Sequence, residues 1–334
     1  MGDSLSPLEH EESPTPRGVA IVPLPMSGQV APSAITRGSR LGAESLRVAF
    51  LGSRVWLEGC CPAAPAHGLI PQRVEVGPGA DIEAVLSATR SFEPDMTVLF
   101  VPTSIPSEAL NELPGIALGV LVEDELTLGL EDVARGLDRL VSFFPALTGS
   151  KLGAAEVWRA VPPPVADALF GEVRPPRGKP LAMSVGRASF HREWMLMLAK
   201  HHHDLLQVVH GVSGPPLVEL LREYDVGIHV SREPGGAFGH QVGMHLAAGH
   251  LLLTEAPTPA HGLERDIDYL HVNSPKGLAW TLDRLARFPE MYQRIRIRGR
   301  LKAEQYRASR LFPRIAHDLL ADVKAFGSNR APGD

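Results

Sequence analysis

Short apolar runs that end in small or acidic residues recur along the chain, and they constrain its fold more than any other feature. In the first half these runs cover residues 46–53, 95–102, 115–124 and 139–146. Each has the length of a buried parallel strand, and a helical stretch at 81–92 separates the first two. Strands that alternate with helices or loops predict βαβ units and a parallel sheet.

The same pattern begins again after residue 178. We predict strands at 179–186, 204–211, 225–231, 250–255 and 269–274, with a helix at 239–249. Three successive prolines, Pro162–Pro164, separate the two halves and are typical of a stiff connector. The sequence therefore predicts an α/β protein with two Rossmann-like domains, parallel sheets and an interdomain cleft.

The predicted domain boundaries follow from these patterns. Residues 1–45 are rich in proline, serine and glycine, and we predict a disordered N-terminal tail. Residues 46–160 are the predicted N-terminal Rossmann-like domain, and residues 161–328 are the predicted C-terminal one.

Composition excludes several classes of protein. A net charge of −5 argues against a nucleic-acid partner, and no apolar run approaches a transmembrane segment of about 18 residues. The acidic N-terminus lacks the apolar core of a secretory signal, so we expect a cytoplasmic protein. Cys60 and Cys61 are adjacent and unsuited to a disulfide framework. Of the 33 basic residues 27 are arginine, a bias that suggests a GC-rich bacterial genome.

Two stretches of the second half have the residues of an anion site. In "SVGRASFHREW" a predicted strand ends at Gly186, and Arg187 and Arg192 supply cations that grip several phosphate oxygens. A helix begins at Gly239 and His240, where free N–H groups and the helix dipole favour an anion. The alternatives are a surface loop with two solvated arginines and an ordinary helix cap.

Glu123 and Asp124 follow a predicted strand of the first domain, where a carboxylate at the cleft could act as a general base. Acidic residues after strands are otherwise helix caps. The arginine run at 293–302 fits a solvated helix face better than an RNA site. The histidines have no metal-ligand spacing, so we expect no metal; they include His201–His203, His240, His245 and His250.

Taken in order, three stretches resemble the GT-B glycosyltransferases, most closely the glycosyl transferases group 1 domain of spore-maturation-type proteins. They are "SVGRASFHREW", "LLREYDVGIHVS" and "FGHQVGMHLAAGHLLLTE". The resemblance covers about residues 160–326. It implies a donor-binding second domain, an acceptor-side first domain, a nucleoside-diphosphate sugar as donor, an unknown acceptor, and neither metal nor other cofactor.

In that family two glutamates bracket the helix start, and the second holds the ribose hydroxyls. Here Met244 stands at the second position and Gly236 at the first, while Glu233 lies three residues early. A thioether cannot accept two hydroxyl hydrogen bonds. Glu233, His240 or His245 could substitute. The predicted donor site comprises Gly186, Arg187, Arg192, Ser231, Glu233, Gly239, His240, Met244 and His245.

Two functions remain open from the sequence. One is a hexosyl-type transferase with an altered donor site. The other is a binding or scaffold protein on a transferase fold that has lost catalysis. A sugar-nucleotide epimerase of the same two-domain fold is a more remote alternative. The resemblance favours the enzyme by analogy.

Overall fold

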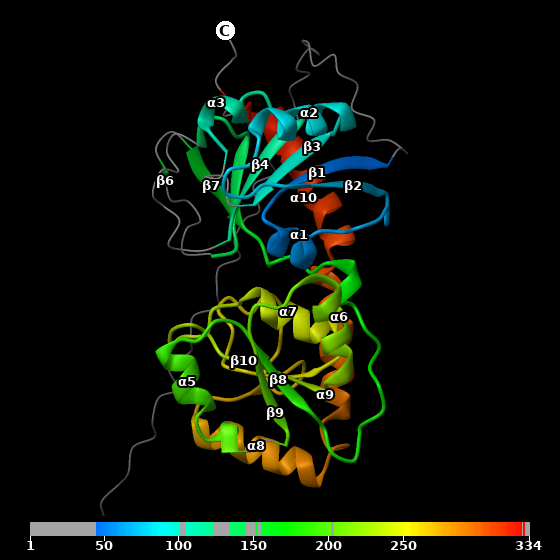
Figure 1. Cartoon of the computed structure of the whole chain (residues 1–334), viewed down its shortest axis with the longest axis vertical. Coiled ribbons are helices and arrows are strands. Elements are labelled where there is room, and N and C mark those ends of the chain that lie inside the picture. The colour runs from blue at the N-terminus through cyan, green and yellow to red at the C-terminus, as the bar shows by residue number, and fades with distance from the viewer. Residues whose placement is uncertain are drawn as a thin grey trace, which may run out of the picture. The chain divides into compact units, whose positions relative to one another are not determined.

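The computed structural model describes residues 45–100, 105–122, 134–144, 151–152, 155–201, 204–328 and 330. Two separate sheets with their helices make up this part of the chain (Figure 1), as the predicted α/β class requires. The predicted tail lies outside the described residues, apart from residue 45.

The first sheet has seven strands in the order β2-β1-β3-β4-β5-β7-β6, and only β6 is antiparallel to its neighbour. Its strands are β1 (Leu46–Gly52), β2 (Leu69–Glu75), β3 (Met96–Phe100), β4 (Ile116–Leu121), β5 (Arg139–Ser142), β6 (Lys151–Leu152) and β7 (Ala155–Ala160). Its helices are α1 (Arg54–Cys60), α2 (Ile82–Phe92) and α3 (Ser107–Leu110). Sequence patterns predicted β1, β3, β4 and β5, and they missed the other three strands.

The second sheet has five parallel strands in the order β12-β11-β10-β8-β9. They are β8 (Ala182–Val185), β9 (Leu206–Val209), β10 (Val226–His229), β11 (Leu251–Thr254) and β12 (Leu270–His271). The helices that follow are α5 (Phe190–Leu196), α6 (Gly214–Glu223), α7 (His240–Ala247), α8 (Pro275–Arg287), α9 (Gln293–Lys302) and α10 (Ala308–Phe326). All five strands lie within the predicted ranges.

The strand order of the second sheet creates a topological switch point. From β8 the chain moves outward to β9, and it then crosses back to β10 on the other side of β8. The loops after β8 and β10 therefore leave the sheet in opposite directions. In open α/β sheets the crevice beyond the carboxyl ends of two such strands is the usual place for a ligand.

The last helix, α10, packs against the first sheet (Figure 1). Its buried residues Phe312, Ile315 and Leu319 belong to the same core as Phe50 and Val98. The rings of Phe50 and Phe312 meet edge to face, with centroids 4.7 Å apart. The C-terminal residues therefore complete a core that the N-terminal strands begin.

The arginine run of α9 is divided between two faces of the helix. Arg294 and Arg298, four residues apart, are exposed, as expected for a solvated face. Arg296 is buried, and its Nε donates to the carbonyl oxygen of Gly249 at 2.5 Å. Arg300 donates to the carbonyl oxygen of Gly171 at 2.7 Å. Only half of the run is thus the solvated face expected from the sequence.

Among the described residues no helix is long and apolar enough to cross a membrane.

We predict that Phe312→Ala lowers the free energy of unfolding by about 3–5 kcal/mol, because it leaves a cavity beside Phe50. The control is Phe326→Ala on the same helix, whose side chain is 81% exposed. Urea denaturation of both variants measures the difference. Equal stability of the two variants would contradict the packing of α10 against the first sheet.

Candidate functional site

The candidate site lies at the switch point of the second sheet, beyond the carboxyl ends of β8, β10 and β11. The segments that meet there are residues 186–192, 230–240 and 255–256. They include most of the residues that the sequence singled out. The geometry of each decides what it can do.

Arg192 is buried and ties two of these segments together. Its Nε and Nη2 donate to the carbonyl oxygen of Val230 at 3.1 and 2.8 Å, and its Nη1 donates to the carbonyl oxygen of Arg187. These bonds use three of the five N–H groups of a guanidinium. Burial lowers the pKa of Arg192, although Glu193 and Glu255 oppose that shift. The side chain is therefore a structural tie between the ends of β8 and β10, with two N–H groups left for other partners.

Gly186 makes this tie possible. Its φ of 134° lies in a region that residues with a side chain rarely adopt, and an added Cβ would lie 2.5 Å from Nη1 of Arg192. Arg187, the next residue, is exposed. Of the two predicted cations, Arg187 is thus the one placed to meet an anion from solvent.

A carboxylate that the sequence reasoning missed lies at the end of β11. Glu255 Oε1 accepts a hydrogen bond from His191 Nε2 at 2.7 Å, and Oε2 accepts from the backbone N–H of Ser231 at 3.0 Å. Both ring and carboxylate are largely buried, with side-chain exposures of 11% and 14%. Glu255 is the last letter of the stretch "FGHQVGMHLAAGHLLLTE". Its position directly after an apolar strand was the signal that could have identified it.

The loop before α7 offers little room for a carboxylate of its own. Gly236 has a φ of 67°, and an added Cβ would lie 2.2 Å from the carbonyl oxygen of Ala256. The same Cβ would lie 3.6 Å from that of Glu255. Glu233 is exposed to solvent. Glu255 therefore lies next to the position where the resemblance places a glutamate.

The start of α7 keeps the backbone geometry expected of an anion site. Gly239 is the N-cap, and no side chain caps the helix there. The His240 side chain is turned away to another partner, because its Nε2 donates to the carbonyl oxygen of Gly59 at 2.9 Å. Burial lowers the pKa of His240, so the ring is neutral near pH 7. The N–H of Gly239 donates to the carbonyl oxygen of Ala237 at 2.9 Å, so Gly239 is not the free donor expected from the sequence. What this helix end can offer a ligand begins with the backbone N–H of His240.

Met244 and His245, the remaining predicted residues on α7, lie in the core, with exposures of 1% and 0%. Met244 packs with Phe238 and Tyr306 in one apolar cluster. His245 Nδ1 lies 3.0 Å from His250 Nδ1, and His250 Nε2 donates to the carbonyl oxygen of Leu221. The two rings therefore form a buried chain of neutral histidines that packs inside the domain.

Two further expectations concern catalysis and metal binding. Glu123 and Asp124, the predicted general bases, lie outside the described residues. In the described part of the chain no group of three or more histidine, cysteine, aspartate or glutamate side chains is arranged to hold a metal ion.

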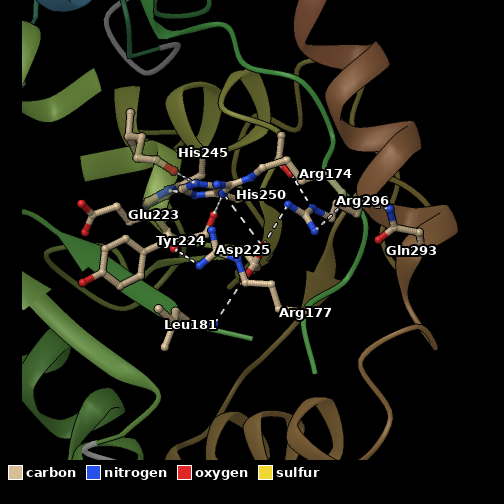
Figure 2. Close-up of polar contacts among 12 residues, drawn as sticks. Arg174, Arg177, Leu181, Glu223, Tyr224, Asp225, His245, His250, Gln293 and Arg296 are labelled. Carbon is tan, nitrogen blue, oxygen red and sulfur yellow. Dashed lines mark hydrogen bonds and ion pairs between the residues drawn. The ribbon is translucent and has the colours of Figure 1, made fainter. Parts of the chain in front are cut away.

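A second polar cluster surrounds Asp225, directly before β10 and thus at the opposite, amino edge of the sheet (Figure 2). Its carboxylate oxygens lie 3.4 Å from Arg296 Nη2, 3.9 Å from Arg174 Nη2 and 3.6 Å from Arg177 Nε. Burial lowers the pKa of Arg296. The adjoining crevice, about 20 Å³, has room for little more than a water molecule. We interpret this cluster as structural.

The buried histidines of the second domain are neutral. Burial, reinforced by the nearby charge of Arg192, lowers the pKa of His229 to about 3. Burial also lowers the pKa of His250 to about 4, although its bond to Leu221 opposes the shift. His229 Nδ1 lies 3.0 Å from the hydroxyl oxygen of Thr254. These rings fill the space beneath the site without adding charge to it.

The fold is that of the GT-B glycosyltransferases. HepE from Anabaena, crystallised with UDP and glucose, superposes with a TM-score of 0.52 at 8% identity, over 83% of this chain and 100% of that one. Sucrose-phosphate synthase from Thermosynechococcus elongatus gives 0.53 at 11%, over 83% and 99%. A glycosyltransferase from Rickettsia africae gives 0.51 at 11%, over the same shares. No protein-family model matches the sequence, and no curated protein matches it either.

We predict that stability falls as the pH drops from about 6.5 toward 4, because unfolded histidines take up protons that the folded rings refuse. Since the folded pKa of His250 is about 4, it contributes on average about 1 kcal/mol per pH unit across that window. His250→Gln should flatten the dependence. Urea denaturation across the window, with the exposed His317→Gln as control, measures it; equal slopes for the two variants would contradict the assignment.

Proposed function

We propose that this protein is a glycosyltransferase that uses a nucleoside-diphosphate sugar as donor and binds the donor diphosphate at the switch point of the second sheet. The observation that supports the proposal is that a positive-φ glycine and an exposed arginine after β8 lie at the same carboxyl edge of the second sheet as the start of α7, which no side chain caps. This edge is where open α/β sheets bind ligands, and its groups suit an anion.

Each group has a proposed role in holding the diphosphate. Arg187, which is exposed, grips phosphate oxygens with its guanidinium. Arg192 holds the loop in place through Val230 and offers its two remaining N–H groups. The backbone N–H of His240 receives the second phosphate, because the N–H of Gly239 already donates to the carbonyl oxygen of Ala237 at 2.9 Å. Because arginines and a helix dipole neutralise the charge, the proposed site needs no metal ion.

The nature of the donor is an inference from structural likeness. HepE has been crystallised with UDP-glucose as well as with UDP and glucose. Uridine diphosphate sugars are therefore the first donors to test. Transfer also requires a base for the acceptor, and Glu123 or Asp124, which follow β4 in the sequence, remains our proposal for it. The acceptor itself stays open.

A second function, a binding or scaffold protein on the same fold, is favoured by one observation. Met244 lies in the apolar core and Gly236 has no space for a side chain, so neither position contributes a polar group to a donor. Binding of a nucleotide sugar without turnover is the outcome that this alternative predicts.

We predict that Arg187→Ala lowers the affinity for a nucleoside diphosphate about ten- to hundredfold. That range corresponds to the loss of about 1.5–3 kcal/mol from a charge-assisted hydrogen bond. Isothermal calorimetry with UDP, GDP and ADP measures the change. Arg287→Ala is the control, because Arg287 is also an exposed arginine but ends α8. It lies two residues after Leu285, which lines the crevice beside Asp225 at the other edge of the sheet.

Turnover is measured separately, as release of the nucleoside diphosphate from its sugar. Equal affinities of wild type and Arg187→Ala would remove the phosphate assignment. Binding that depends on Arg187 but produces no nucleoside diphosphate with a panel of acceptors would favour the binding protein over the enzyme.

A further inference from the structure

We propose that Glu255 and Ser231 form a hydroxyl-binding subsite next to the diphosphate site, where they accept hydrogen bonds from the ribose or from the transferred sugar. The inference rests on the proposed function, since it takes the ligand to be a nucleotide sugar. It assigns to these two residues the task that Gly236 and Met244 cannot perform.

The Glu255 carboxylate lies beside Ser231 at the carboxyl edge of the second sheet. Glu255 follows β11, Ser231 follows β10, and the N–H of Ser231 bonds to Glu255 Oε2 at 3.0 Å. The adjacent carbonyl oxygen of Val230 accepts from Arg192, whose Nη1 lies against Gly186. The subsite and the proposed phosphate site are therefore linked through one residue of backbone. A ligand with a diphosphate in the first has its hydroxyl-bearing groups within reach of the second.

The Glu255 carboxylate can accept further hydrogen bonds. An ionised carboxylate has about four acceptor positions on its two oxygens. Two of them are used, one by His191 Nε2 and one by the backbone N–H of Ser231. These two bonds fix the orientation of the Glu255 carboxylate, and its remaining acceptor positions stay available. The side chain is 14% exposed. A fixed carboxylate that can still accept hydrogen bonds is suited to ligand hydroxyls.

The hydroxyl of Ser231 is a second group that could bond to a ligand. Its Oγ is buried and has no hydrogen-bond partner in the described part of the chain. An unpaired buried hydroxyl lowers the stability of the fold, and a ligand hydroxyl that reached it would supply the missing bond. Rotation about one side-chain bond is enough to redirect it. Glu255 and Ser231 together could thus serve two hydroxyl groups of one ligand.

The same residues do not form a hydrolytic triad. His191 Nε2 is engaged by Glu255, and Ser231 Oγ has no histidine partner among the described residues. Nothing in that set takes a proton from the serine, as nucleophilic catalysis would require. His191 also stacks on the half-exposed Trp194, with ring centroids 5.8 Å apart. The geometry therefore favours a binding role for the carboxylate.

The experiment compares Glu255→Gln and Ser231→Ala with wild type, and Glu219→Gln is the matched control. Glu219 is an exposed glutamate on α6 that belongs to no part of the proposed site. The ligands are UDP and UDP-glucose, GDP and GDP-mannose, and ADP and ADP-glucose, and calorimetry gives each affinity. The melting temperature of every variant reports whether the fold survives.

We expect Glu255→Gln to weaken binding about ten- to hundredfold, as for other lost charge-assisted hydrogen bonds. Weaker binding of the nucleotide sugar alone assigns the subsite to the transferred sugar, whereas equal weakening for the free diphosphate assigns it to the ribose. Ser231→Ala should weaken binding several-fold and leave the melting temperature unchanged or higher, because the serine hydroxyl has no partner in the described residues. Glu219→Gln should match wild type.

Two results overturn the inference, and they are distinguishable. If wild type binds a nucleotide and both Glu255→Gln and Ser231→Ala bind it equally well, or if Glu219→Gln loses as much affinity as Glu255→Gln, the subsite is wrong and the proposed function stands. If wild type binds none of the six ligands, the proposed function fails and the subsite fails with it.

Discussion

The buried guanidinium of Arg192 is the interaction on which the candidate site depends. It holds the carbonyl oxygens of Arg187 and Val230 together and so joins the loops that leave β8 and β10. Gly186 has a φ of 134°, which favours glycine, and an added Cβ there would lie 2.5 Å from that guanidinium. The charge of Arg192 also helps to keep His229 neutral. One side chain therefore sets the backbone, the packing and part of the electrostatics at the switch point of the sheet.

The proposed function depends on the groups that remain available to a ligand once Arg192 has joined the two loops. Arg187 is exposed, and no side chain caps the start of α7. Glu255 keeps acceptor capacity beside the hydroxyl of Ser231, which has no partner among the described residues. Cation, helix start and carboxylate are the complements of a phosphate and of sugar hydroxyls. These complementary groups, together with a fold shared with glycosyltransferases, are the basis of the proposed donor site.

The sequence predicted the fold well where burial produces a simple pattern. β3, β10 and β11 are buried along their whole length, and such strands appear as unbroken apolar runs. β2 was missed because most of its residues are only half-buried and it contains Pro71. The helical pattern of α10 was visible, but the sheet that receives Phe312 depends on contacts between distant parts of the chain.

The site was harder to predict because its chemistry depends on tertiary partners. From the sequence we expected Arg192 to bind phosphate and Arg296 to lie on a solvated helix face. Both are buried and donate to carbonyl oxygens of other segments. His245 was considered as a substitute for a missing carboxylate, and it lies in the core against Gly227. Glu255 was in plain view after an apolar strand, but only the pairing of β10 with β11 shows that it meets Ser231.

A crystal structure of the protein soaked with UDP-glucose would show directly whether the donor binds at the carboxyl edge of the second sheet. Our account predicts the diphosphate beside Gly186, Arg187 and the N–H groups that begin α7, with at least one ligand hydroxyl within hydrogen-bond distance of Glu255. A nucleotide bound at the opposite edge of the sheet, near Asp225, or one whose hydroxyls make no contact with Glu255 or Ser231, would contradict it.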